Sequence, residues 1–167
     1  VIGQRFYQIE KTQRANALGY LLAYHRPEST VVFCNTKRDC QDIASALENS
    51  GFSVQALHGD LEQKHRDQVL VRFANKSCSI LVATDVAARG LDIPEIEYII
   101  HYQLPASEDI MIHRNGRTAR MKSTGTAYFL LDHDDHLPKF LTTVPEEEPL
   151  PKKLILPKPC EWKTLYI

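Results

Sequence analysis

Short runs of β-branched and aromatic residues alternate with helix-like stretches along most of this chain, and no other feature limits its possible folds as strongly. Nearly continuous apolar runs predict strands at Arg5–Ile9, Thr30–Asn35, Ser53–Leu57, Ser79–Thr84, Tyr98–Tyr102 and Gly125–Leu131. Runs of this kind are typical of strands covered on both faces, and helices between them are typical of parallel connections. We therefore expect an α/β fold with a doubly wound, mostly parallel sheet and helices on both faces.

Polar residues mark where two of the intervening helices begin. Thr36, with an acidic residue three positions later, resembles a capping box and predicts a helix over Lys37–Asn49. Asp60 and Gln63 are expected to cap a second helix that runs through Phe73. Both helices would begin just after the carboxyl end of a predicted strand.

Length and composition describe one globular domain with an extension. The chain has 167 residues, of which 43% are hydrophobic and 25% charged. Residues 1–131 hold all the predicted alternation, 132–161 are rich in proline and charge, and 162–167 again read as a strand. We expect a single domain, then an extension or linker, then the truncated start of a following domain.

Charge and cysteine usage exclude several classes of protein. The net charge of -1 predicts no general affinity for nucleic acid, so any basic surface must be local. The four cysteines form no CxxC pair, and Cys34 lies in an apolar run, as a small buried hydrophobe would. No apolar run approaches the roughly 20 residues that span a bilayer. We expect a cytoplasmic location, no membrane association and no metal site.

The stretch His113–Arg120 carries the strongest chemical signal. If it is helical, His113, Arg117 and Arg120 share one face, because neighbours on a helix face lie three and four positions apart. Adjacent guanidinium groups repel one another unless an anion lies between them, and phosphate suits their planar fork best. The alternative is a solvated basic face.

Three further stretches place polar residues directly after predicted strands. They are Val31–Arg38, Leu57–Arg66 and Ala83–Pro94. Because the carboxyl ends of parallel strands meet at one edge of a sheet, Thr36, Gly59 and Thr84 are expected to lie along that edge, where such sheets bind ligands. Helix capping alone would also explain both threonines.

Four motifs in this order resemble the second-lobe motifs of DEAD-box helicases of superfamily 2: Val32–Thr36, His58–Arg66, Ala83–Asp92 and His113–Arg120. The resemblance covers roughly residues 1–131, and the wording of the motifs is most similar to the DbpA-type bacterial helicases of large-subunit ribosome assembly. It implies a RecA-like fold and an ATP-dependent RNA helicase that acts on ribosomal RNA.

The resemblance also implies roles around the nucleotide. Arg117 and Arg120 would be arginine fingers that stabilise charge on the γ-phosphate of ATP during transfer. His113 would connect their helix to the partner lobe. Gly90 and Asp92 would contact the nucleotide, with Asp92 at the ribose.

A second set of residues would hold the RNA backbone or support that contact, without reading sequence: Thr36, Gly59, Gln63, Arg66, Thr84 and Arg89. For Gln63 and Arg89, a role at the RNA face and a role at the lobe interface both stay open.

Two motifs of the complete enzyme do not occur in this sequence. It contains neither a GxxxxGK[ST] loop nor a DEAD sequence, which would seat the β- and γ-phosphates and Mg²⁺. By the resemblance, an N-terminal RecA-like lobe supplies them, so ATP with Mg²⁺ would bind only when the two lobes are paired. The fragment alone would be inactive.

The sequence leaves several alternative interpretations of function open. A DNA-directed helicase lobe would diverge from the pattern of Thr36, Arg66 and Thr84, whereas a non-enzymatic RecA-like platform for protein or RNA would have no use for paired arginine fingers. Trp162–Ile167 resembles the opening strand of an RNA-recognition domain; the alternative is that these residues pack back on the lobe. His101, in a strand-like run, is expected to be a hydrogen-bonded structural histidine.

Overall fold

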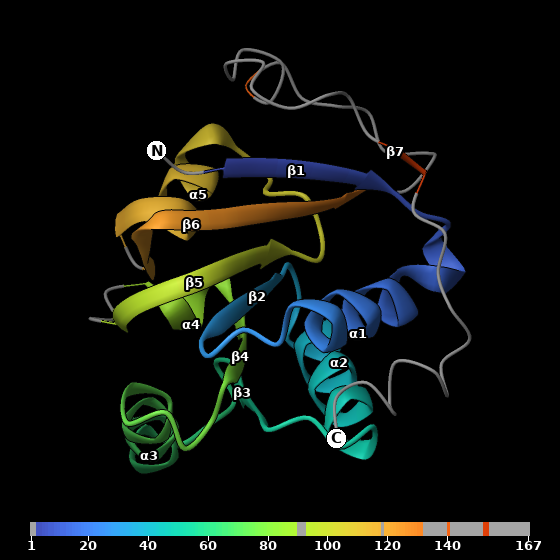
Figure 1. The fold of residues 1–167 in the computed structure, drawn as a ribbon. Coiled ribbons are helices and arrows are strands. Elements are labelled where there is room, and N and C mark those ends of the chain that lie inside the picture. Colours follow the sequence, from blue (N-terminus) through green and yellow to red (C-terminus); the bar gives the residue numbers. More distant parts are fainter. Residues whose placement is uncertain (1–2, 90–92, 118, 132–139, 141–151, 154–167) are drawn as a thin grey trace.

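The described strands form a single parallel sheet. The computed structural model describes residues 3–89, 93–117, 119–131, 140 and 152–153. The strand order is β3-β4-β2-β5-β6-β1-β7, and every pair of neighbours runs parallel (Figure 1). The α/β, mostly parallel architecture predicted from the sequence is confirmed.

The elements alternate along the chain as expected. The strands are β1 Gly3–Gln8, β2 Thr30–Cys34, β3 Val54–Leu57, β4 Ile80–Thr84, β5 Ile93–His101, β6 Ala119–Leu131 and β7 Lys152–Lys153. The helices are α1 Arg14–His25, α2 Lys37–Asn49, α3 Gln63–Ala74, α4 Asp85–Ala88 and α5 Glu108–Ile112, with a 3-10 turn Lys11–Gln13 and a π-helical turn His113–Arg117.

Helices cover both faces of the sheet. One apolar core lies between the sheet and the helices α1 and α2. On the opposite face, a second core packs under α3 and α4, and a third one under α5 (Figure 1). The central strands β2 and β4 are buried along their whole length, which explains their nearly continuous apolar sequence.

Capping explains where some helices begin but not all. Helix α2 has the predicted bounds, and its N-cap Thr36 accepts a hydrogen bond from the backbone amide of Asp39. The predicted capping of α3 by Asp60 and Gln63 is wrong. Glu62 occupies the N-cap and makes no side-chain capping bond, while Gln63 is the first helical residue.

The largest departure from the prediction is at the start of β6. The expected helix over His113–Arg120 ends at Arg117, and Arg120 lies on a strand that begins at Ala119. Glycine is a poor interior helix residue, so Gly116 weakens the continuation of the helix. Ala119 then pairs with Ile93 at the start of β5. Thus Arg120 does not share a helix face with His113 and Arg117.

Little of the chain after β6 can be compared with the prediction. The proposed extension 132–161 and the segment 162–167 lie outside the described residues, apart from Phe140 and β7. Phe140 packs against the core under α5, and β7 adds to the sheet beside β1. Within the described part of the chain, no helix is long and apolar enough to cross a bilayer.

Candidate nucleotide and nucleic-acid site at the carboxyl edge

The expected row of residues lies at one edge of the sheet. Strands β3, β4 and β2 are neighbours in this order, and Cys34 at the end of β2 is in register with Thr84 at the end of β4. Gly59 follows β3, and Thr36 follows β2. The fold therefore brings Gly59, Thr84 and Thr36 to the carboxyl edge of three adjacent strands, as predicted.

Both threonines of this row cap helices. Thr36 Oγ1 accepts from the amide of Asp39 at 3.1 Å and donates to its Oδ2 at 2.8 Å. Thr84 Oγ1 accepts from the amide of Ala87 at 3.4 Å at the start of α4. Thr36 is exposed, whereas Thr84 is only 7% exposed. Of the two hydroxyls, that of Thr36 is the more accessible to a ligand.

Arg66 joins two helices at this edge. From α3, its Nη2 donates to the carbonyl oxygen of Ala87 in α4 at 3.0 Å. Its buried Nε has no hydrogen-bond partner among the described residues. A buried guanidinium nitrogen without an acceptor is costly, and a phosphate oxygen would satisfy it.

Three other predicted contact residues lie on the exposed rim. Gly59 is exposed, and a Cβ added there would meet no described heavy atom within 4 Å, so internal packing does not require glycine. Gln63 is exposed, and its Nε2 donates to Asp67 one helical turn further on. Arg89 is exposed at the C-cap of α4. All three side-chain positions are open to a ligand or another lobe.

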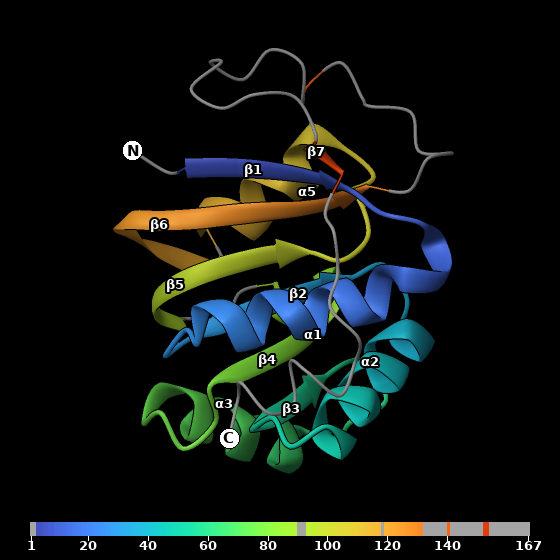
Figure 2. The ribbon, with the colours of Figure 1, turned by 45° about the vertical axis from the view of Figure 1, so that its right-hand side comes forward.

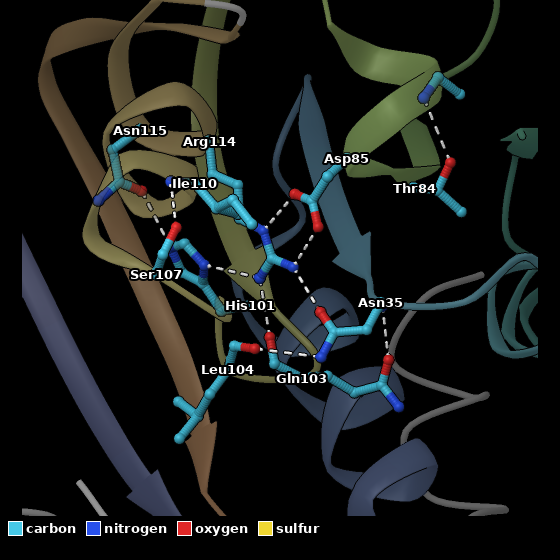
Figure 3. Close-up of polar contacts among 11 residues, drawn as sticks. Asn35, Thr84, Asp85, His101, Gln103, Leu104, Ser107, Ile110, Arg114 and Asn115 are labelled. Atoms are coloured by element: carbon cyan, nitrogen blue, oxygen red, sulfur yellow. Dashed lines mark hydrogen bonds and ion pairs between the residues drawn. The ribbon is translucent and has the colours of Figure 1, made fainter. Parts of the chain in front are cut away.

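A buried arginine that the sequence did not single out organises this edge. Arg114 is 1% exposed, and its guanidinium is held by Asp85 in a two-point ion pair, Nε to Oδ1 at 2.6 Å and Nη2 to Oδ2 at 2.8 Å (Figure 3). Nη2 also donates to Asn35 Oδ1 at 2.7 Å, and Nη1 to the carbonyl oxygen of Gln103 at 2.8 Å. These contacts join the ends of β2, β4 and β5 to the helix of Arg114.

His101 completes this arrangement in its neutral form. It is fully buried, its ring stacks on Phe129 at 4.1 Å, and burial, with the nearby charge of Arg114, lowers its pKa to about 3. Arg114 can only donate, so Nδ1 of His101, 3.3 Å from Nη1, must accept. Nε2 then carries the proton and donates to Asn115 Oδ1 at 2.9 Å. The prediction of a hydrogen-bonded structural histidine is confirmed.

The same contacts extend to Thr36, the exposed N-cap of α2. Gln103 donates from Nε2 to Asp39 Oδ2 at 2.8 Å, the same oxygen that accepts from Thr36. Its Oε1 accepts from the amide of Asn35 at 2.6 Å. We call this set the Arg114 network: Asn35, Thr36, Asp39, Asp85, His101, Gln103, Arg114 and Asn115. It links the exposed edge to the turn that leads to Arg117.

His113 borders a small cavity beside this network. The cavity has an empty volume of about 280 Å³, and its lining includes Arg89 at the C-cap of α4 and His113 and Arg114 of the π-helical turn. The backbone of Arg117 ends the π-helical turn, and that of Arg120 lies in β6. Their side chains, as well as Gly90 and Asp92, lie outside the described residues. For the two predicted arginine fingers, the structure therefore describes only the position of the backbone.

Arg114 was missed as a functional residue because its partners are distant in sequence. Asp85 is 29 residues away and Asn35 is 79 residues away. In the sequence it stands close to two other arginines, Arg117 and Arg120, and only its burial in the fold sets it apart. The available signal was an acidic residue directly after a buried strand, at Asp85.

Reactive groups of other kinds do not gather at this edge. The thiol of Cys34 is buried, as predicted, and burial raises its pKa. Burial also raises the pKa of Cys40 to about 11, so neither thiol ionises near neutrality. Among the described residues, no three His, Cys, Asp or Glu side chains are arranged to hold a metal ion. The charged groups described at this edge suit recognition of an anion such as phosphate.

Comparisons with known proteins agree with this geometry. Residues 13–122 match the model of the helicase conserved C-terminal domain. The chain is 52% identical to the ATP-dependent RNA helicase DbpA of Escherichia coli over 126 residues, which is 75% of the chain and 28% of that protein. Among the most similar curated proteins, the chain spans only 18% to 28% of the relative's length.

Solved structures of DEAD-box proteins are similar to this chain as well. The Escherichia coli DEAD-box protein SrmB, bound to regulator of ribonuclease activity A, superposes with a TM-score of 0.78 and 33% identity, covering 95% of both chains. The RNA helicase Prp28 of Chaetomium thermophilum, bound to ADP, gives a TM-score of 0.72 and 33% identity over 81% of this chain and 34% of that one. The chain therefore belongs to the family of helicase conserved C-terminal domains and is the C-terminal RecA-like lobe of a DEAD-box RNA helicase.

Proposed function

We propose that this lobe supplies arginine fingers for ATP hydrolysis and half of an RNA-backbone track, in a protein that locally unwinds RNA duplexes. Arg117 and Arg120 would stabilise the γ-phosphate charge, and His113 would lie at the junction with the N-terminal lobe. Gly90 and Asp92 would contact the nucleotide. Prp28, a relative in structure, binds ADP, which is consistent with a nucleotide at this fold.

The observation that carries the proposal is the Arg114 network. It fixes the start of the π-helical turn against the ends of β2, β4 and β5 through the ion pair of Arg114 with Asp85. Arg117 follows within that turn, so its backbone position depends on the same contacts. An arginine finger acts only if it is held in place before the reaction, because its contribution is electrostatic preorganisation.

RNA recognition would use the exposed edge. The phosphates and sugars of the RNA would be contacted, or those contacts supported, by six residues of this edge: Thr36, Gly59, Gln63, Arg66, Thr84 and Arg89. The buried Nε of Arg66 and the unconstrained Gly59 support this assignment, since both fit a backbone that approaches from outside. A nucleic-acid backbone supplies the acceptor oxygens that these donors need.

The test is RNA-stimulated ATP hydrolysis by the full-length protein that contains this lobe. Arg120→Ala is expected to lower kcat by about 10³-fold or more, since arginine fingers contribute that much in related phosphoryl-transfer enzymes. Arg72→Ala is the matched control, because Arg72 is an exposed arginine in the last turn of α3. An unchanged kcat in Arg120→Ala would exclude the finger assignment.

The complete reaction needs groups from outside this chain. Mg²⁺ and the β- and γ-phosphates would be held by the N-terminal lobe, and the isolated lobe would hydrolyse no ATP. Adding this lobe to a separately produced N-terminal lobe should restore RNA-stimulated turnover. Turnover by the isolated chain would contradict the proposal.

We also propose that the RNA is ribosomal, that the protein acts in the cytoplasm during ribosome assembly, and that an RNA-recognition domain follows this lobe. The support is the wording of the four motifs and the strand-like end at Trp162–Ile167. Competition binding of the full-length protein to ribosomal and unrelated RNAs of equal length tests the target. Equal affinities would exclude a specific ribosomal target.

A further inference from the structure

A groove rich in aromatic rings lies on the face of the sheet that α1 packs against, and none of its described lining residues belongs to the Arg114 network. It runs between α1 and the strands β5, β6 and β1, with an empty volume of about 780 Å³. In Figure 2, α1 crosses in front of β2, whereas β6 and β1 lie above it, and no described helix covers them on this side. We define the tyrosine groove by the aromatic side chains that line it: Tyr7, Tyr20, Tyr24, His25, Tyr98 and Tyr128.

The rings of the groove form one connected surface. The centroids of His25 and Tyr98 are 5.3 Å apart, those of Tyr98 and Tyr128 also 5.3 Å, and those of Tyr7 and Tyr128 5.9 Å. Tyr128 is 2% exposed and forms the floor, whereas Tyr24 is 65% exposed and forms the rim. The groove thus offers flat apolar faces in a fixed arrangement.

The polar atoms of the groove are mostly uncharged. Burial is the main cause that raises the pKa of Tyr98 and Tyr128 and lowers that of His25. Both hydroxyls and the imidazole are therefore neutral near pH 7. Arg5 is the only charged side chain among the described residues that line the groove. This lining suits an extended apolar peptide, since aromatic grooves with neutral hydroxyls recognise proline-containing segments.

Single-stranded nucleic acid would also stack on tyrosine rings, but it fits this groove less well. Its backbone needs a row of cations, as in other single-strand tracks. Among its described lining residues only Arg5 is a cation near pH 7, and Glu97 is close enough to influence the pKa of His25. A peptide of low charge is the better match.

The chain itself leads such a peptide to the groove. Strand β7 pairs in parallel with β1, with Lys152 opposite Tyr7 and Lys153 opposite Gln8. Lys153, the last residue of β7, therefore lies one register position past Tyr7, a lining residue of the groove, so the following segment would reach the groove by reversing its direction. Residues 154–160 read Leu-Ile-Leu-Pro-Lys-Pro-Cys, an apolar run with two prolines.

The available length is sufficient. The groove floor extends from Thr126, in register with Gly3, to Tyr7. Four steps along a strand cover about 13 Å. Residues 154–160 alone can span about 23 Å when extended, which leaves room for a turn at the edge of the sheet.

We propose that the tyrosine groove is the docking site for residues 154–160 of this same chain, bound as an extended segment with Pro157 and Pro159 against the tyrosine rings. Because the segment is tethered at β7, its effective concentration at the groove is in the millimolar range, so even a weak contact is populated. Docking would fix the path of the chain from β7 across this face of the lobe.

Photo-cross-linking of the full 167-residue chain tests this directly. Cys34, Cys40 and Cys78 are buried, so a thiol-reactive benzophenone should label Cys160 selectively. Mass spectrometry is expected to find the cross-links on the peptides that contain Tyr20–His25, Tyr98 or Tyr7. Cross-links spread over other surfaces would overturn the proposal.

Two variants make the result specific. Tyr24→Ala removes an exposed ring of the rim and should lower the yield of groove cross-links at least fivefold. Val71→Ala is the matched control, because Val71 is 62% exposed on α3, on the other face of the sheet, and should leave the yield unchanged. Equal yields in both variants would refute docking in the groove.

Other occupants are distinguished in the same experiment. In a mixture of isotopically light and heavy chains, mixed cross-links would show that the segment of a second copy fills the groove, which would overturn the intramolecular assignment. A uridine oligonucleotide that displaces the cross-links and itself cross-links to Tyr24 would assign the groove to RNA. The double variant Pro157→Gly/Pro159→Gly should reduce the yield of groove cross-links by as much as Tyr24→Ala does.

Discussion

Two histidines among aromatic rings show how differently the carboxyl edge of this sheet and the tyrosine groove on its α1 face are stabilised. At the carboxyl edge, His101 stacks on Phe129 and accepts from a buried arginine. In the tyrosine groove, His25 lies beside Tyr98 and accepts from or donates to the Tyr128 hydroxyl at 3.1 Å. The first histidine belongs to a network built around a buried ion pair, whereas the second contacts neutral rings.

The difference predicts how each region tolerates the loss of one member. A buried charge that loses its partner keeps its full desolvation cost, so the Arg114 network should fail when any charged member is removed. A neutral hydroxyl leaves behind only one unsatisfied polar atom. The Arg114 network is therefore the more fragile of the two, although it is also the better connected.

Asp85→Ala should have the largest effect on stability. The change leaves the guanidinium of Arg114 buried without its carboxylate, which typically costs about 3–5 kcal/mol. Urea denaturation of the intact chain, followed by circular dichroism, measures the loss in free energy of unfolding. A loss below about 1 kcal/mol would mean that water or a neighbour reaches Arg114, and the contrast between the two regions would disappear.

The second largest effect is expected in the pH dependence of stability, which should distinguish His101 from His25. The pKa of His101 is about 3 in the folded chain and about 6.5 when unfolded, so the unfolded chain binds the proton first as pH falls. The stability that neutral, buried His101 contributes to the folded chain is fully present above pH 6.5. As the pH falls from 6.5 to 3, this contribution to the free energy of unfolding is lost at about 1.4 kcal/mol per pH unit. We expect about 2 kcal/mol of this loss by pH 5.

His101→Gln provides the reference for that measurement, because glutamine does not titrate. The unfolding free energy of the variant should fall less steeply between pH 6.5 and 5 than that of the original chain. Burial lowers the pKa of His25 as well, so it acts in the same direction and persists in both proteins. Equal slopes would show that His101 is protonated in the folded chain.

The sheet was predictable from the sequence because its signals are local. Buried strands such as β2 and β4 read as apolar runs, and the cap at Thr36 set the beginning of α2. The first half of β5 was not predicted, since the expected strand was Tyr98–Tyr102, whereas β5 spans Ile93–His101. Pairing with β6 extends that segment, and pairing is a property of the tertiary structure.

The candidate site was predictable in its row of strand ends but not in its centre. Gly59, Thr84 and Thr36 align because parallel strands end at the same edge. The burial of Arg114 follows from partners that the chain brings together only on folding. The same holds for Arg120, which the helical periodicity placed on a helix and which the pairing of Ala119 places on a strand.

Tyr128→Phe tests the neutral region and should cost less. It removes the hydroxyl that contacts His25 and keeps the ring in the core, so the expected loss is about 1 kcal/mol. Tyr24→Phe is the control, because Tyr24 is largely exposed and should change little. The measurement is again the free energy of unfolding at pH 7. A loss as large as that of Asp85→Ala would erase the distinction between charged and neutral networks.

The smallest effect is expected where a charge pair is exposed. Lys37 and Asp60 lie 3.0 Å apart at the same edge as Arg114, but their side chains are 61% and 63% exposed. A double-mutant cycle with Lys37→Ala and Asp60→Ala should give an interaction free energy below about 1 kcal/mol. It should shrink further in 1 M salt, because water and ions screen exposed charges. If this pair contributed about 3 kcal/mol, proximity alone would explain the strength of Arg114 with Asp85, and burial would not be its cause.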